Sequence, residues 1–158
     1  MVDSSEYILL VASMFIFAML QLGLTSVLLN NTKTMVKSEL DYTAVALAQN
    51  IADESRSKAF DEAAVGSLKS LKDSDFSSLG PDAGEVYPYF DDFDDYHNYT
   101  RTDTTQTGIF KTSCRVDYMQ ENDLKQVSVL KTSFKRLFVQ VVSETKDTVA
   151  VTYIKSYY

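Results

Sequence analysis

The sequence predicts an α+β fold in which a long amino-terminal α-helix packs on a small antiparallel β-sheet of three or four strands. Three observations lead to this prediction. Positions 7–32 carry no charge, although 23% of the 158 residues are charged. Positions 36–52 keep apolar residues at helical spacing, and positions from 109 onward alternate with the period of two that is typical of strands. The segment between these regions holds both prolines and four of the five glycines, which favours loops.

The first element is predicted to be a hydrophobic helix over residues 1–29 that serves as a membrane anchor. Positions 7–29 contain 18 apolar residues out of 23. A bilayer core about 30 Å thick needs about 20 helical residues, so this segment is long enough to span it. The apolar run is longer than that of a secretory signal peptide, and no Lys or Arg precedes it. We therefore expect the segment to remain in the mature protein.

The helix is predicted to continue over residues 30–60 as an amphipathic element. The apolar residues thin into one stripe with the spacing i, i+4, i+7, i+8 and i+11, and acidic and basic residues lie on the other face. The stripe consists of Leu40, Ala44, Leu47, Ala48 and Ile51. One helix from near Tyr7 to near Phe60 would be about 80 Å long at 1.5 Å per residue.

Residues 61–108 are predicted to form a loop region. Its most distinctive stretch reads FDDFDDYHNYT at positions 90–100. An EF-hand loop would need Gly at its sixth position and a terminal Glu, and this stretch has neither. We expect no metal site here, but a surface loop held to the domain by its aromatic side chains. Asn98 begins an Asn-Tyr-Thr acceptor tripeptide and is a candidate glycosylation site.

Residues 109–158 are predicted to form the antiparallel sheet. Strands are expected at positions 110–119, 134–143 and 148–156, with positions 124–130 as a further strand. The strands at 134–143 and 148–156 are joined by a short Glu-Thr-Lys-Asp turn. Leu137, Val139 and Val141 should share one face, which the amphipathic part of the helix would cover.

Composition argues against several classes of function. A net charge of −7 disfavours nucleic-acid binding, which needs clustered Lys and Arg. The only His and the only Cys, His97 and Cys114, stand in no nucleophile motif, so we predict no enzyme, no catalytic residues and no cofactor. A single Cys excludes an intrachain disulfide and every multi-Cys metal site.

Two positions in the apolar segment have more than one interpretation. Glu6 precedes the apolar run and either marks the membrane interface or, among packed helices, pairs with the amino terminus of an adjacent copy, because a buried unpaired charge is costly. Gly23 lies among polar residues. It marks either a helix break or a small-residue contact between packed helices.

The order of these elements resembles that of type IV pilins and related pilin-like proteins. The likeness rests on the acidic residue before a charge-free apolar run, the amphipathic continuation, the Asp-rich FDDFDDY loop and the late hairpin SFKRLFVQVVSETKDTVAVTYIKSYY, and it covers most of the chain. The resemblance implies a structural subunit, placed first in the inner membrane and then polymerised by the pilus assembly machinery into an extracellular filament at the cell surface. Copies of the same chain would be its partners. The polymerisation residues that it implies are Met1, Glu6, Ile8, Leu9, Phe15, Phe17, Leu20, Leu24 and Leu28.

The sequence departs from the pilin pattern at its amino terminus. Pilin precursors carry a short basic leader, and none precedes the helix here, so the resemblance implies a processed chain in which Met1 is the exposed residue. The family's glutamate is the fifth mature residue, whereas here position 5 is Ser5 and the carboxylate is Glu6. The alternative function is a membrane-anchored surface binding protein that does not polymerise. Such filaments serve cell adhesion, motility, DNA uptake, secretion or electron transport. The residues favour none of these roles over the others.

Overall fold

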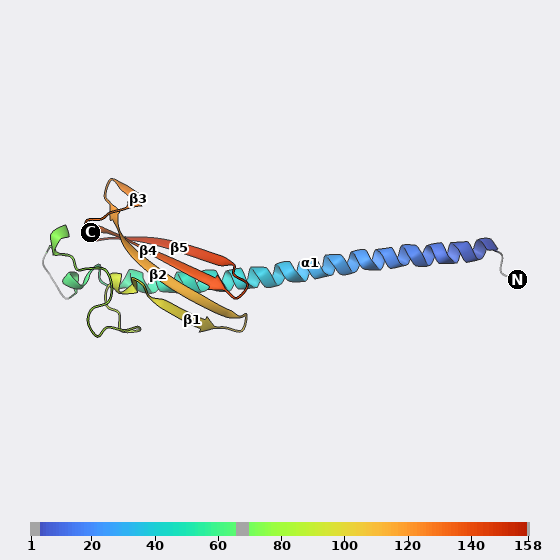
Figure 1. Cartoon of the computed structure of the whole chain (residues 1–158), viewed down its shortest axis with the longest axis horizontal. Coiled ribbons are helices and arrows are strands. Elements are labelled where there is room, and N and C mark those ends of the chain that lie inside the picture. The colour runs from blue at the N-terminus through green and yellow to red at the C-terminus, as the bar shows by residue number, and fades with distance from the viewer. Residues whose placement is uncertain (1–3, 66–69, 158) are drawn as a thin grey trace. The chain divides into compact units, whose positions relative to one another are not determined.

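The computed structural model describes residues 4–65 and 70–157 of the chain. It divides into two compact units between Glu39 and Leu40. Both units contain part of one long helix, α1 (Ser4–Ser57), and the second unit also contains all the strands (Figure 1). The described residues therefore form an α+β structure, as predicted.

The first unit is a single helix in which several hydroxyl side chains form hydrogen bonds with the preceding turn. Ser13 Oγ donates a hydrogen bond to Leu10 O at 2.8 Å, and Thr25 Oγ1 donates one to Gln21 O at 2.9 Å. Such bonds to the preceding turn occupy hydroxyl groups without any outside partner. The helix therefore needs no water for the hydroxyl groups of Ser13 and Thr25.

The second unit, here called the head, comprises residues 40–157. Within it, the last part of α1 buries one face of small and apolar residues, which are Ala44, Ala48, Ile51, Ala52 and Ser55. This spacing places the residues on one stripe of the helix. The predicted stripe and the observed one share Ala44, Ala48 and Ile51, and Leu40 and Leu47 pack half-buried at its margin.

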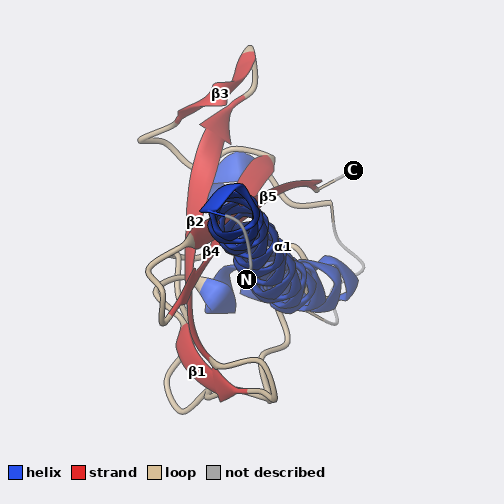
Figure 2. Ribbon diagram, turned by 90° about the vertical axis from the view of Figure 1, so that its right-hand side faces the viewer, coloured by secondary structure: helices blue, strands red, loops and turns tan. Residues whose placement is uncertain are grey.

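The sheet contains five strands, and every described pair of neighbours is antiparallel. The strands are β1 (Thr100–Thr104), β2 (Ile109–Gln120), β3 (Asp123–Val127), β4 (Phe134–Ser143) and β5 (Thr148–Ser156). Their order is β1-β2-β4-β5, and β3 pairs with the end of β2. Figure 2 shows β1 and β3 at opposite ends of β2.

The predicted strands agree closely with the observed ones, except that β1 was not predicted and β3 is shorter than predicted. The bounds of β4 and β5 are those predicted, β2 is longer by one residue at each end, and β3 ends at Val127 rather than at position 130. The loop predicted over residues 61–108 contains β1, so a sheet of five strands replaces the predicted three or four. The helix ends at Ser57, close to the predicted end near Phe60.

The core of the head lies between the last part of α1 and the inner face of β2 and β4. The residues of β4 alternate strictly, and Lys135, Leu137, Val139, Val141 and Ser143 are buried. The predicted face of Leu137, Val139 and Val141 is thus confirmed. Phe110, Cys114 and Val116 of β2 complete this layer against Ala44, Ala48 and Ile51.

The segment between α1 and β1 is held to the head by aromatic side chains, as expected. Its described residues include the short 3₁₀ helices η1 (Glu62–Ala64), η2 (Asp73–Asp75) and η3 (Asp94–Tyr96). Phe90, Phe93 and Tyr96 are buried in the main core. A second, smaller cluster combines Phe60, Phe76 and Tyr118. The Asp-rich stretch is therefore a packed part of the head.

Candidate functional site

Two features of the chain stand out as candidates for function: an exposed apolar helix surface and a buried lysine between two carboxyl groups. The first is the apolar stem, defined here as residues 7–29 of α1. Its large apolar side chains are 56–73% exposed, and every described residue up to Glu39 is exposed. A helix that is apolar on all sides belongs in a membrane or inside a protein assembly.

The predicted polymerisation residues all belong to this exposed surface where they are described. Glu6 is exposed in the first turn of α1, and Met1 lies outside the described residues. The apolar ones are 61–70% exposed and consist of Ile8, Leu9, Phe15, Phe17, Leu20, Leu24 and Leu28. The helix break considered at Gly23 is not present, because α1 continues through this residue. A Cβ at Gly23 would meet no atom within 4 Å, so the chain has open space for a close neighbour there.

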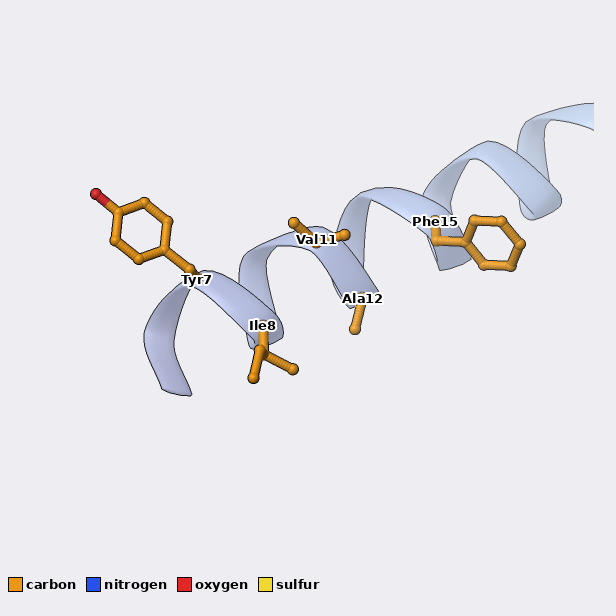
Figure 3. A pocket seen from close by; sticks show the side chains of 5 residues that line it. All are labelled: Tyr7, Ile8, Val11, Ala12 and Phe15. Atoms are coloured by element: carbon orange, nitrogen blue, oxygen red, sulfur yellow. The ribbon is translucent and has the colours of Figure 1, made fainter. Parts of the chain in front are cut away.

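The amino-terminal end of the apolar stem carries a shallow apolar hollow. Its lining residues are Tyr7, Ile8, Val11, Ala12 and Phe15, which lie on successive turns (Figure 3). Ala12 is the smallest of the five and stands between Ile8 and Phe15 at i, i+4 and i+7 spacing. A side chain of another helix could enter such a hollow, as knobs enter holes in packed helices.

The second feature is the buried lysine site, formed by Lys135, Asp61 and Asp94. Lys135 Nζ donates a hydrogen bond to Asp61 Oδ2 at 2.6 Å and another to Asp94 Oδ1. The side chains of Lys135 and Asp61 are fully buried, and that of Asp94 is 1% exposed. Lys135 Nζ also donates to the carbonyl oxygen of Phe60 at 3.0 Å. The lysine thus joins β4 to the segment that follows α1 and to η3.

Asp61 and Asp94 differ in their surroundings. Burial alone would raise the pKa of Asp61, but the hydrogen bond and charge of Lys135, with backbone N–H groups of Ser77 and Ala63, lower it overall. Burial raises the pKa of Asp94, and Lys135 offsets this only in part. The two carboxyl groups are therefore shifted in opposite directions around one ammonium group.

The neighbouring acids of the Asp-rich stretch bind its own backbone. Asp92 Oδ1 accepts N–H bonds from Asp94 at 2.8 Å and from Asp95 at 3.1 Å. Asp95 Oδ2 accepts N–H bonds from Asp91 at 3.0 Å and from Asp92 at 3.1 Å. Burial, and after it the charge of Asp94, raises the pKa of Asp92 to about 7. These carboxyl groups hold the loop in shape.

Three carboxyl groups of the described residues come close enough to share a cation. They belong to Glu62, Glu85 and Asp91, whose oxygens lie within 4.8 Å of one another. Asp91 is exposed and Glu62 and Glu85 are partly exposed, and acidic groups gather at surfaces without binding ions. We do not assign them as metal ligands.

A second lysine, Lys155 of β5, closes the end of α1. Its Nζ donates hydrogen bonds to the carbonyl oxygens of Arg56 and Ala59, both at 3.2 Å, and to that of Lys58. Carbonyl oxygens at the end of a helix lack helical partners, and a cation there is favourable. Burial lowers the pKa of Lys155.

The remaining singled-out residues have structural surroundings. Asn98 is exposed, so its side chain is accessible, and its backbone has a positive φ of 63°. His97 Nδ1 lies 2.7 Å from Val116 O and 3.2 Å from Val116 N, so the backbone occupies this ring atom. Burial raises the pKa of the Cys114 thiol to about 12, which keeps it protonated at neutral pH.

Sequence reasoning missed the buried lysine site, although one signal was present. Lys135 stands at a position of β4 whose neighbours at i+2, i+4 and i+6 are Leu137, Val139 and Val141. A charge in line with the inner face of a strand needs a buried counter-charge. The alternation therefore pointed to Lys135, but it could not identify Asp61 and Asp94, which lie 74 and 41 residues away in sequence.

No protein-family model, no curated protein and no solved structure matches this chain.

Proposed function

We propose that this protein is a structural subunit that polymerises through its apolar stem into an extracellular filament resembling type IV pili. The observation that carries this proposal is the exposure of the stem on all sides: every large apolar side chain from Tyr7 to Leu29 is more than half exposed. Burying one such side chain contributes about 1.5–3 kcal/mol. A surface of this size needs a nonaqueous environment on all sides.

Two environments meet that requirement at different stages. The helix is long and apolar enough to cross a membrane, so a bilayer is suitable before assembly. Other copies of the same stem are suitable afterwards, because they replace lipid with apolar side chains. A contact of this kind places different surfaces of successive copies together, and such contacts do not close but extend a helical polymer.

The apolar hollow supports packing between copies. Ala12 leaves space between Ile8 and Phe15, and Gly23 offers open space further along the stem. Small residues let helices approach closely, which is how helices associate where no water drives them together. In this proposal Glu6 pairs with a cation of the adjacent copy once it leaves the aqueous interface.

A membrane-anchored binding protein that does not polymerise is the second candidate. It is favoured by the same span, since a single helix of this length anchors a protein by itself. The two functions differ in where the chain is found. We expect filaments visible by negative-stain microscopy in material sheared from the cell surface, with this chain identified in them by mass spectrometry. Recovery of the chain only from detergent-solubilised membranes would overturn the filament and support the anchor.

Replacing Glu6 by Ala tests the role of the stem's carboxylate. We expect Glu6→Ala to reduce the yield of sheared filament strongly, because the pairing between copies is lost, without changing the folding of the head. Glu39→Ala is the matched control, since Glu39 is also an exposed glutamate of α1 but lies at the head end of the helix, whereas Glu6 directly precedes the apolar stem. Normal filament yield from Glu6→Ala would contradict the pairing.

A further inference from the structure

The buried lysine site brings an amine and two carboxyl groups together, shielded from solvent. Lys135 Nζ is within hydrogen-bond distance of Asp61 Oδ2, at 2.6 Å, and of Asp94 Oδ1. All three side chains are at most 1% exposed. An amine held against a carboxyl group in this way has the arrangement that amide formation requires, since reacting groups held in contact gain a large effective concentration.

Aromatic rings enclose the amine. Lys135 Nζ lies 4.7 Å from the ring centroid of Phe60, 5.2 Å from that of Tyr118 and 5.9 Å from that of Phe76. Such a shell excludes water and lowers the local dielectric constant. Water stabilises the charged ammonium and carboxylate strongly, and a dry environment does so much less. The neutral amine and carboxylic acid are therefore easier to form here than in water. The neutral pair is the reactive form.

We propose that Lys135 and Asp94 join in an intramolecular isopeptide bond, and that Asp61 acts as the general base and acid for this reaction. The site is thus a self-modification site of the head, whose only substrates are its own side chains. The inference does not depend on the proposed filament function, because all three residues lie within the head.

The reaction balances without any other reactant. A proton passes from the ammonium of Lys135 to the carboxylate of Asp94, which gives a neutral amine and a carboxylic acid. The amine nitrogen attacks Cγ of Asp94, and Asp61 Oδ2 takes a proton from the nitrogen. Asp61 returns this proton to the departing hydroxyl group, so one C–N bond forms, one C–O bond breaks and one water molecule leaves. No atom is oxidised or reduced, and Asp61 is regenerated as a carboxylate.

The hydrogen bonds assign the two carboxyl groups to different roles. Asp61 accepts N–H bonds from Ser77 at 2.8 Å and Ala63 at 3.1 Å, and these bonds favour its ionised form. Its Oδ2 also lies within reach of the hydroxyl of Tyr118, at 3.4 Å. The partner of Asp94 apart from Lys135 is the hydroxyl of Ser77, at 3.2 Å. The opposite pKa shifts of the two groups agree with a base at Asp61 and an acid at Asp94.

The bond would provide a covalent link that the sequence otherwise lacks. The single Cys excludes an intrachain disulfide. An isopeptide bond between β4 and η3 would close a loop across 41 positions of sequence and fix the Asp-rich stretch to the sheet. Cross-links of this kind restrict the unfolded chain and stabilise the fold.

Intact mass spectrometry of the full chain, unfolded after purification in detergent, tests the proposal. We expect a mass lower than that of the sequence by one water molecule. Trypsin should then fail to cleave after Lys135, and tandem spectra should show a branched peptide that joins Lys135 to Asp94. Lys155 is the internal control, because it is partly buried and its Nζ donates hydrogen bonds only to carbonyl oxygens, and trypsin should cleave after it. The full mass with free Lys135, or a water loss located elsewhere, would overturn the proposal.

Variants separate the roles of the residues. Asp94→Ala and Asp61→Ala should both restore the full mass for their sequence, the first by removing the electrophile and the second by removing the base. Asp73→Ala is the matched control, because Asp73 accepts a hydrogen bond from Ser133 and has no bond to Lys135, and the water loss should persist. A complete Lys135–Asp94 bond in Asp61→Ala would overturn the role of Asp61. The wild-type mass decides whether the bond exists even if a variant fails to fold.

Discussion

The two parts of α1 have the same backbone structure and opposite surroundings. Up to Glu39 every described side chain is exposed, whereas between Leu40 and Ser57 one stripe packs in the core of the head. In the head, small residues such as Ala44 and Ala48 form the buried face, while larger apolar residues of the stem have no partner in the single chain. Helix formation and burial are therefore separate problems: the head buries its stripe within one chain, whereas the apolar side chains of the stem stay exposed in the single chain.

The largest expected effect concerns the charge buried in the head. Lys135→Ala would remove both the ion pairs with Asp61 and Asp94 and the proposed bond to Asp94, and would leave the carboxyl groups buried without a partner amine, so we expect the free energy of unfolding to fall by about 3–5 kcal/mol. Urea unfolding in detergent, followed by near-ultraviolet circular dichroism of the tyrosines, measures this change. Lys111→Ala is the control, since Lys111 is exposed on the outer face of β2. Equal unfolding midpoints for the two variants would contradict the importance of the buried site.

The same substitution in the two parts of α1 tests the comparison directly. Ile51→Ala removes a side chain that is fully buried, and should destabilise the head by about 2–5 kcal/mol. Ile8→Ala removes one that is 69% exposed, and should change unfolding by less than about 0.5 kcal/mol while reducing filament yield. Denaturant unfolding and the quantity of sheared filament are the two measurements. Similar unfolding free energies for the two variants would remove the distinction between stem and head.

The stability of the head should depend on pH because of its buried acids. The pKa of Asp92 is raised from 3.8 to about 7 in the folded state, so the folded head holds a proton that the unfolded chain releases over this range. Its contribution to stability is therefore complete below pH 3.8 and is lost as the pH rises to about 7, with a slope of up to about 1.4 kcal/mol per pH unit. The raised pKa of Asp95 acts in the same direction.

Asp92→Asn should flatten this slope, because the amide oxygen still accepts the two backbone N–H bonds but does not titrate. Unfolding free energies measured at about pH 5 and about pH 8 would show it. The stem carries no such buried acid among its described residues, so filament yield from Asp92→Asn should resemble that of the wild type. An unchanged slope in Asp92→Asn would place the titrating group elsewhere.

The smallest effect is expected at the end of α1. Lys155→Met removes the cation from the last carbonyl groups of the helix and should cost about 0.3–2 kcal/mol of head stability. Lys125→Met is the control, because Lys125 is exposed on β3. Thermal unfolding of both variants checks the difference. A loss equal to that of Lys125→Met would show that the helix end is satisfied without Lys155.

Sequence periodicity predicted the parts of the fold that depend on local pattern. β4 and β5 have the predicted bounds because Leu137, Val139 and Val141 alternate with polar residues up to a short turn. β1 was missed because its residues, TRTDT, contain no apolar side chain, and its pairing with β2 supplies what its composition lacks. The apolar stem was predicted because a long apolar run without charge can be recognised from the sequence alone.

The buried lysine site shows why the rest could not be predicted. Its members come from three segments, and only the folded topology brings them together. The Asp-rich stretch was expected to be a surface loop, yet Asp92, Asp94 and Asp95 are buried, because each carboxyl group binds backbone N–H groups or Lys135. Four aspartates in a short stretch look the same in the sequence whether they face water or a buried lysine. The composition of the stretch therefore could not reveal its burial.

The two lysines that fasten the head also set the order of events during synthesis. Lys135 finds Asp61 across 74 positions of sequence, and Lys155 reaches Arg56 across 99. The stem therefore leaves the ribosome long before the head can close, and its apolar surface is present while the head is still unfolded. Contacts so distant in sequence form slowly, since a long loop must close before they are made. The apolar surface of the stem is therefore available to a partner before β4 and β5 have been made.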